Sequence, residues 1–207
     1  MAETAVRYLR SVGAATVAEP APARAHPDAH PHPRPRPGLR AVREDERLPL
    51  DPGEFRRVLG HFASGVTVIT ARDAEGPAGF ACQSFASLSL DPPLIAFMVA
   101  RTSTTWPRIA RAGAFCVNVL GADQGELCRG FAVSGADKFA GVGHGPAPVS
   151  GAPRLTGVPA WLDCTIHAVH TGGDHLIVVG RVDALDAVAE GGEPLLFHRG
   201  RFGHFTA

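Results

Sequence analysis

The pattern of hydrophobic and polar positions divides the chain near residue 50. Residues 1–50 are rich in Ala, Pro, Arg and His and have few large apolar side chains, so packing would not offset the entropy lost on ordering. We therefore expect a disordered tail over 1–50 and one folded domain over 51–207. His26, His30 and His32 are interpreted as part of this Pro-His tail rather than as a metal site.

The folded domain is predicted to open with a short helix. Asp51, Pro52 and Glu54 match a capping box with an Asp cap and Pro at the first helical position. Apolar residues then recur at i, i+3, i+4 and i+7, which predicts one buried face. These residues are Phe55, Val58, Leu59 and Phe62, and a Ser-Gly pair at 64–65 is expected to end the helix.

Most of the remaining pattern is typical of strands. Strands are predicted at residues 66–71, 94–99, 115–120, 161–170, 175–182 and 195–197, with turns at 73–77, 91–93 and 172–174. Short helices are expected at 106–111, ended by Gly113, and from Asp123 through Phe131, where Glu126 completes a capping spacing. Residues 141–159 are predicted to be a long Gly/Pro loop. This order favours an antiparallel barrel with short helical insertions over a parallel sheet.

Residues 79–98, GFACQSFASLSLDPPLIAFM, combine small and hydroxyl side chains with an Asp-Pro-Pro turn and an apolar strand. A strand that only fills a core favours β-branched and aromatic residues. Small side chains let backbone groups approach a flat polar ligand, and hydroxyls add donors. We expect the first hairpin to bring Ser84 beside the strand at 66–71. A Ser-rich edge strand without a ligand is the alternative interpretation.

A second polar stretch, Arg101 to Pro107, places four hydroxyl residues before a predicted helix. The N-terminus of a helix offers unpaired N–H groups and a positive dipole end, so the stretch favours a phosphate cradle. A Thr cap of the helix is the alternative. Lys138, the only lysine of the chain, is a candidate anion partner.

Charge and cysteine content narrow the classes of partner. Lys plus Arg and Asp plus Glu both number 20, so no basic field exists to gather nucleic acid or an acidic membrane surface. No apolar run is long enough for a membrane helix, and the N-terminal residues do not match a secretory signal, so we expect a cytoplasmic protein. The four cysteines are far apart without a C-x-x-C motif, and we interpret them as buried thiols.

Few residues are suited to acid, base or nucleophilic catalysis. The sequence has no G-x-G-x-x-G motif after a strand and no G-K-[ST] phosphate loop. A hydrolase triad of Ser84, His175 and Asp174 lacks a G-x-S-x-G elbow. His167, His170 and His175 straddle a turn without the carboxylate of a typical metal site. Hydride transfer between two bound cofactors needs the fewest protein groups and is favoured.

Five segments, taken in order, resemble the flavin reductase components of two-component flavin-dependent monooxygenases. The resemblance covers about residues 55–205. The segments are CQSFASLSLDPPLIAF, STTWPRIARAGAFCVNVLGADQGELCRGFA, DKF, GDH at 173–175 and the closing FHRGRFG. It implies a mainly β fold, a Greek-key split β-barrel, in a homodimer that binds FMN or FAD. It further implies reduction of the flavin by NADH or NADPH and its release to a partner oxygenase.

The resemblance also assigns roles to residues of this chain. It implies that the flavin ring lies against Ala81, Cys82, Gln83, Ser84 and Ser87, and that the flavin phosphate lies near Ser103, Thr104 and Thr105, with Lys138 as an addition. His175 is expected to meet the nicotinamide nucleotide, and Arg201 with Phe202 to hold it. Cys82-Gln83 departs from the smaller or Asn/Ser residues of many relatives, which leaves the preferred flavin open.

Two other functions are compatible with the same barrel. One is a flavoprotein that retains its flavin, as a sensor or a self-contained oxidoreductase. The other is a binding or interaction module without catalysis. The sequence does not separate NADH from NADPH, or identify the oxygenase.

Overall fold

The computed structural model of the protein describes residues 50–135, 137–188 and 192–205. The chain divides into two units, Met1–Phe55 and Arg56–Ala207, and only residues 50–55 of the first are described. The predicted disordered tail, with His26, His30 and His32, therefore lies outside the described residues except for Leu50.

Helix α2 (Pro52–Leu59) begins at the predicted capping box. The backbone N–H of Glu54 donates to Oδ1 of Asp51 at 2.8 Å, as an N-cap requires. The helix ends before the Ser-Gly pair, which forms the short strand β1 (Ser64–Gly65) instead. The prediction of a buried face is wrong. Periodicity identifies an apolar face but not what covers it, and the four apolar residues of this face are 52–81% exposed: Phe55, Val58, Leu59 and Phe62.

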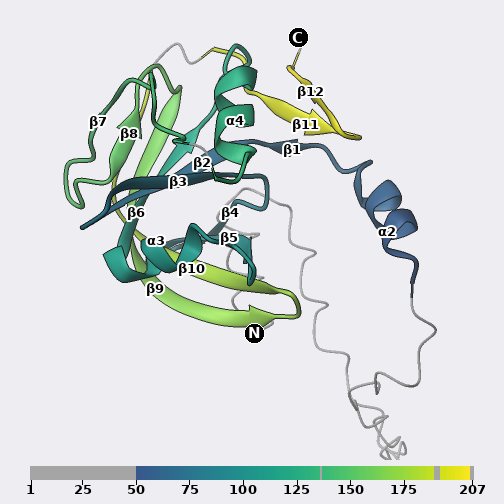
Figure 1. Ribbon diagram of the computed structural model, residues 1–207, viewed down its shortest axis with the longest axis horizontal. Coiled ribbons are helices and arrows are strands. Elements are labelled where there is room, and N and C mark those ends of the chain that lie inside the picture. Colours follow the sequence, from purple (N-terminus) through teal and green to yellow (C-terminus); the bar gives the residue numbers. More distant parts are fainter. Residues whose placement is uncertain (1–49, 136, 189–191, 206–207) are drawn as a thin grey trace, which may run out of the picture. The chain divides into compact units, whose positions relative to one another are not determined.

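A seven-stranded antiparallel sheet forms the body of the second unit (Figure 1). Its strand order is β3-β2-β6-β9-β10-β5-β4. The strands are β2 (Thr67–Asp73), β3 (Gly76–Cys82), β4 (Ala86–Leu90), β5 (Pro93–Ala100), β6 (Ala114–Val119), β9 (Ala160–Gly172) and β10 (His175–Ala187). The edge strands β3 and β4 follow each other along the chain, and β3 also contacts β5. The sheet therefore curls round on itself, which confirms the predicted antiparallel barrel.

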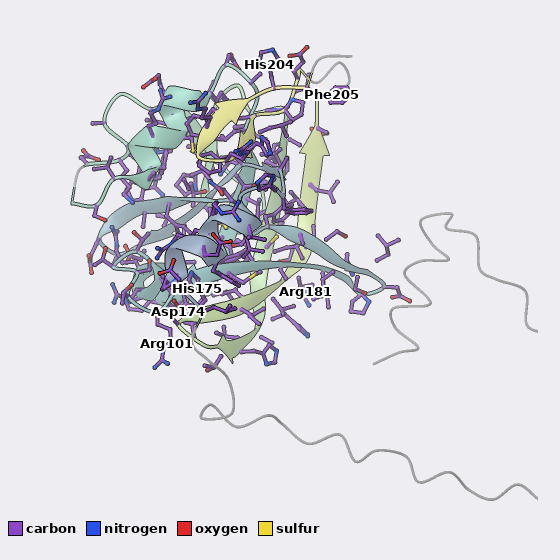
Figure 2. All side chains as sticks on the ribbon, turned by 90° about the vertical axis from the view of Figure 1, so that its right-hand side faces the viewer. Arg101, Asp174, His175, Arg181, His204 and Phe205 are labelled. Atoms are coloured by element: carbon purple, nitrogen blue, oxygen red, sulfur yellow. The ribbon has the colours of Figure 1, made fainter. Side chains whose placement is uncertain are left out.

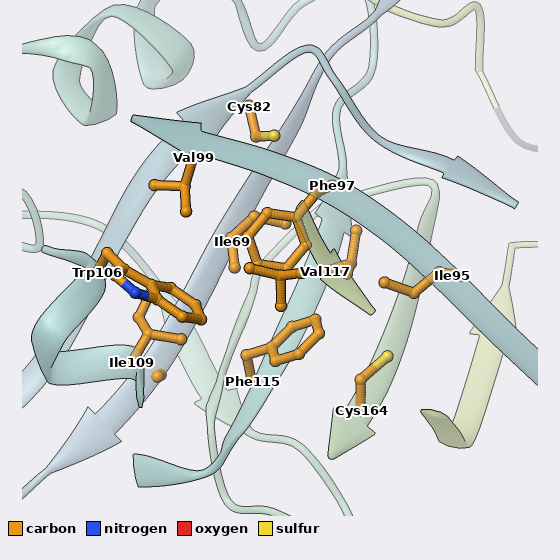
Figure 3. Close-up of a cluster of buried hydrophobic side chains, with 12 residues drawn as sticks. Ile69, Cys82, Ile95, Phe97, Val99, Trp106, Ile109, Phe115, Val117 and Cys164 are labelled. Atoms are coloured by element: carbon orange, nitrogen blue, oxygen red, sulfur yellow. The ribbon is translucent and has the colours of Figure 1, made fainter. Parts of the chain in front are cut away.

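Two aromatic residues, from the non-adjacent strands β5 and β6, meet in the core of the barrel (Figure 3). Phe97 and Phe115 are fully buried, and their rings meet edge to face with centroids 5.3 Å apart. Gly180 makes room for this pair, because a Cβ there would lie 2.5 Å from Cζ of Phe115. All four cysteines are buried and free, as the sequence predicted.

Two smaller sheets depart from the predicted elements. Strand β11 (Leu196–His198) pairs with β1 and with β12 (Arg201–Gly203), so a further strand follows the predicted last one. The predicted loop at 141–159 contains a hairpin of β7 (His144–Pro146) and β8 (Pro153–Leu155). The buried carboxylate of Asp163 holds this segment by accepting the N–H groups of Val149 and Ser150 at 2.8 and 3.0 Å.

Two short helices complete the described fold. Helix α3 (Trp106–Ala112) ends as predicted at Gly113, whose φ of 71° is the left-handed conformation that glycine adopts without strain. Helix α4 (Gly125–Ala132) has Gln124 at its N-cap, so the predicted Asp123 cap is wrong. Within the described ranges no helix has the length and apolar character needed to span a bilayer.

Candidate functional site

Strand β5 brings three of the predicted site segments together. Ser84, in the link after β3, bonds to Met98 of β5, and two residues further on Ala100 pairs with His175 of β10. These two attachment points are about 7 Å apart, given the rise of a strand. The hydroxyl segment starts directly after Ala100, and the N–H of Ser103 donates back to the Ala100 carbonyl at 2.9 Å. The end of β5 is therefore the scaffold of the candidate site.

The hydroxyl of Ser84 joins the link after β3 to strand β5. It donates to the carbonyl of Met98 and accepts from the N–H of the same residue, both at 2.9 Å. The Sγ of Cys82 lies 3.3 Å from it. The prediction that Ser84 lies beside β2 is wrong, because the chain leaves the hairpin at Cys82 and crosses to β5. Ser84 therefore supports the backbone of residues 81–83.

The other residues of the predicted flavin surface differ in exposure. Cys82 points into the core, and burial raises the pKa of its thiol, which keeps it uncharged. Ala81 is partly buried, whereas Gln83 and Ser87 are exposed. The surface that faces solvent is thus formed by small side chains and backbone with one amide.

The hydroxyls before α3 have separate roles. The Ser103 hydroxyl accepts the N–H of Trp106 at 3.2 Å and so caps the helix. Thr105 is the N-cap by position, but its side chain makes no cap bond. The alternative of a Thr cap therefore fails for Thr105, and a serine takes that role. Since α3 has only seven residues, its dipole is a weak basis for phosphate binding.

Lys138 supplies the positive charge that the phosphate prediction needs. It lines a pocket of about 580 Å³ together with Thr104, Thr105 and Gly79. Its Nζ donates to the carbonyls of Gly79 and Phe131 at 3.2 and 3.0 Å. Partial burial lowers the pKa of Lys138 from its usual value. Of the four residues that the resemblance groups at the flavin phosphate, the structure thus brings Thr104, Thr105 and Lys138 together around one pocket and places Ser103 in the helix cap.

Sequence reasoning missed three charged residues of this pocket: Glu75, Arg108 and Asp137. Arg108 was assigned only to the helix, and the hairpin turn was treated as a connection. A signal was available in that turn: Asp73 and Glu75 are two carboxylates beside β3, the strand that leads into the proposed flavin surface. Such a pair indicates a cationic partner close to that surface. Arg108 pairs with Asp73, with Nη2 and Oδ1 2.6 Å apart.

His175 lies at the mouth of the β9–β10 hairpin, as predicted, and is 46% exposed. Its Nδ1 lies 2.7 Å from Oδ1 of Asp174, and this bond lowers the pKa of the Asp174 carboxyl. The carbonyl of Asp174 accepts the N–H of Arg101 at 3.0 Å. Figure 2 shows these three residues grouped at one end of the barrel, away from His204 and Phe205.

Arg201 and Phe202 are not part of this group within one chain. Both line a pocket of about 500 Å³ at the β11–β12 turn. The Phe202 ring packs against Phe197, with centroids 5.6 Å apart, and the Arg129 guanidinium lies over the Phe202 ring, 5.2 Å from its centroid. The structure therefore separates the predicted nicotinamide residues into two places.

The arrangement is poorly suited to hydrolysis. The Ser84 hydroxyl donates to a backbone carbonyl, so His175 does not activate it, and Asp174 is adjacent to His175 rather than behind it. What remains is a small-residue surface, a pocket with one lysine, and a half-exposed histidine at the mouth of the β9–β10 hairpin. This combination positions ligands and supplies charge, which is what transfer between two bound cofactors requires.

Comparison with known protein families gives one match over most of the chain. The model of the flavin reductase like domain matches residues 59–206. These residues include every element of the barrel and all of the candidate site.

Individual relatives agree with this match. The reductase subunit HsaB of a flavin-dependent monooxygenase from Rhodococcus jostii is 50% identical over 153 residues, which cover 74% of this chain and 77% of that protein. A flavin reductase of Pseudomonas putida is 46% identical over 169 residues, which cover 81% of this chain and 98% of the relative.

A solved structure shares the fold. The NADH:FAD oxidoreductase SgcE6 of Streptomyces globisporus, in complex with NAD and FAD fragments, superimposes with a TM-score of 0.71 at 37% identity. The match covers 77% of this chain and 98% of that one.

Proposed function

Because the chain belongs to the flavin reductase like domain family, we propose that it is an NAD(P)H:flavin oxidoreductase that supplies reduced flavin to a partner monooxygenase. Flavin, once bound, accepts a hydride from the nicotinamide, and one solvent proton completes the reaction. The substrates are FMN or FAD and NADH or NADPH. The observation that carries the proposal is the convergence of Ser84, His175 and the hydroxyl segment on the end of β5.

The flavin ring is assigned to the surface of residues 81–84 with Ser87. Gly79 and Ala81 of β3 have small or no side chains, and the Ser84 bonds to β5 fix the link that follows. Backbone N–H groups held in place in this way stabilise negative charge on a ring without reorganising. The exposed amide of Gln83 adds a donor and an acceptor at the edge.

The flavin phosphate is assigned to the pocket of Thr104, Thr105 and Lys138. Its volume of about 580 Å³ lies in the range of small-ligand sites. Among the described residues, no carboxylate lies within ion-pair distance of Lys138 Nζ, which bonds two neutral carbonyls. Its charge therefore remains available for a phosphate.

His175 is assigned to the nicotinamide. The ionised Asp174 accepts from Nδ1, so a neutral His175 presents Nε2 as an acceptor for the carboxamide NH₂. Arg201 and Phe202 remain proposed ligands of the same dinucleotide.

The proposal includes a homodimer. Apolar side chains of α2, of the turn that follows it and of the β4–β5 edge are exposed in the single chain, and burying them needs a second surface. They are Val58, Leu59, Phe62, Leu88, Leu90 and Met98. Sedimentation velocity is expected to give a dimer, and Phe62→Ser is expected to weaken it. A monomeric wild-type chain would contradict this part.

A cytoplasmic location is also proposed. Four free cysteines in one chain fit a reducing compartment.

The reaction is tested by loss of nicotinamide absorbance. NADH or NADPH is mixed with the purified protein, and FMN, FAD or riboflavin is varied. A reductase that releases its product treats added flavin as a saturable substrate. Turnover independent of added flavin would instead indicate a retained cofactor, and no turnover would indicate a binding module.

A further inference from the structure

We propose that Arg108 and Asp73 are a positioning pair that sets the geometry of the flavin-phosphate pocket. The inference rests on the proposed function, because it concerns the same pocket. Neither residue is assigned a contact with the ligand.

The pair has the geometry of a strong interaction. Nε and Nη2 of Arg108 donate to the two carboxylate oxygens of Asp73 at 3.1 and 2.6 Å. The side chains are only 25% and 8% exposed, so solvent screens the pair less than a surface ion pair. Consistent with this, the hydrogen bond from Arg108 lowers the pKa of Asp73 to about 2.

The same guanidinium also holds the start of β3. It donates to the carbonyls of Gly76 and Pro77 at 3.0 and 3.4 Å. Arg108 lies on α3, only three residues after Thr105. One side chain therefore fixes the helix that follows the threonines to the strand that leads into the flavin surface.

The pocket has three walls, and two of them are joined by this pair. One wall is formed by Glu75 and residues 77–79, and the second by Thr104, Thr105 and Arg108. The third wall, at Gly135 and residues 137–139, is joined to the first by the bond from Lys138 to the Gly79 carbonyl. If the bonds from Arg108 to Asp73 and β3 are lost, Thr104 and Thr105 are expected to move relative to Lys138. The bonds from Lys138 to its two carbonyls do not involve Arg108 and should remain.

The two cations of the pocket, Arg108 and Lys138, differ in whether a carboxylate neutralises their charge. Asp73 neutralises Arg108, whereas Lys138 bonds carbonyls and keeps its charge. Lys138 is thus the ligand-binding cation, and Arg108 acts through the position of the threonines.

Arg111 provides a matched control on the same helix. It also reaches Asp73 and Glu75, at 3.4 and 3.1 Å, but it is 57% exposed and does not line the pocket. Arg111→Gln removes a cation of the same cluster without releasing Gly76 or Pro77.

The test compares the Kd of FMN with that of riboflavin, which lacks the phosphate, by quenching of flavin fluorescence. Arg108→Gln is expected to weaken FMN binding about tenfold, the size of a lost hydrogen bond to a charged group. The Kd of riboflavin is expected to change less than about twofold in the same variant. In Arg111→Gln, the Kd of each flavin should also stay within about twofold of wild type. Turnover at saturating FMN should be retained.

The outcomes separate the inference from the proposed function. If the wild-type protein binds FMN and riboflavin equally, the phosphate assignment fails. If the wild type prefers FMN and Arg108→Gln keeps that preference, the positioning role is overturned while the assignment stands. Thermal unfolding is measured on each variant, and a lower Tm with an unchanged FMN-to-riboflavin ratio also overturns the inference. If Arg108→Gln does not fold, Arg108→Lys, which keeps the charge without the fork, replaces it under the same criteria.

Discussion

Asp174 accepts a hydrogen bond from the neighbouring His175, with Oδ1 and Nδ1 2.7 Å apart. The bond lowers the pKa of Asp174 from 3.8, so the carboxylate is charged throughout the neutral range. An ionised carboxylate accepts only, and the proton of a neutral His175 is therefore held on Nδ1. This relationship sets the tautomer of a neutral His175 and leaves its Nε2 without the proton.

Replacing Asp174 is expected to disturb nicotinamide binding. Asp174→Asn carries an amide that also donates, so the imidazole no longer has one preferred tautomer. We expect the KM for NADH to rise about three- to tenfold, the effect of one net hydrogen bond, with the KM for flavin unchanged. Asp186→Asn, at the far end of β10, is the control in the same steady-state assay. An unchanged KM for NADH would show that the tautomer has no role.

Ser84→Ala is expected to loosen the attachment of the link after β3 to strand β5. The change removes both bonds to Met98 and leaves a backbone N–H without that acceptor. We expect about 1–2 kcal/mol of lost stability in urea unfolding, together with a higher KM for flavin. Ser89→Ala on β4 is the control. A direct ligand role alone would instead raise the KM and leave the unfolding midpoint in place.

Lys138 is expected to make FMN binding depend on pH. A lysine with a lowered pKa loses its charge at a lower pH than an ordinary lysine, whose pKa is 10.5. FMN affinity should therefore fall as pH rises towards that value, and riboflavin affinity should not. Lys138→Met should remove the pH dependence and weaken FMN about tenfold. The measurement is the Kd of each flavin as a function of pH. An equal change of Kd with pH for FMN and riboflavin would exclude Lys138 as the phosphate-binding cation.

Asp73 is expected to make the free energy of unfolding depend on pH in the acid range. Its pKa is lowered from 3.8 to about 2, so the folded state binds this proton less readily than the unfolded state. Its stabilisation should be fully present above pH 4 and decline as the pH falls towards 2. The difference in unfolding free energy between wild type and Asp73→Asn should shrink over the same window. A constant difference between pH 6 and pH 2 would contradict the ion pair.

The sequence was sufficient where the signal is local. The Asp51 cap, the hairpin turns and the left-handed Gly113 follow from residue types within a few positions, and all are found. The order of strands also identified the barrel. Lys138 is a candidate from the sequence because it is the only lysine of the chain, and its role remains a proposal.

What the sequence did not reveal depends on partners distant along the chain. Ser84 bonds to Met98, 14 positions along the chain, and Arg108 bonds to Asp73, 35 positions away. No local sequence pattern connects either pair. The apolar face of α2 was identified, but periodicity does not say whether the same chain covers it. Arg201 and Phe202 were placed near His175 by resemblance alone, and the fold of one chain holds them elsewhere.

The central claim is that His175 and the flavin surface belong to one site built on β5. The most direct measurement is a rapid-mixing study of His175→Ala, with flavin Kd determined separately and His170→Ala on β9 as the control. The account predicts slower hydride transfer or a higher KM for NADH, with flavin Kd within about twofold of wild type. Equal loss of flavin binding and hydride transfer, or no change in either, would contradict it.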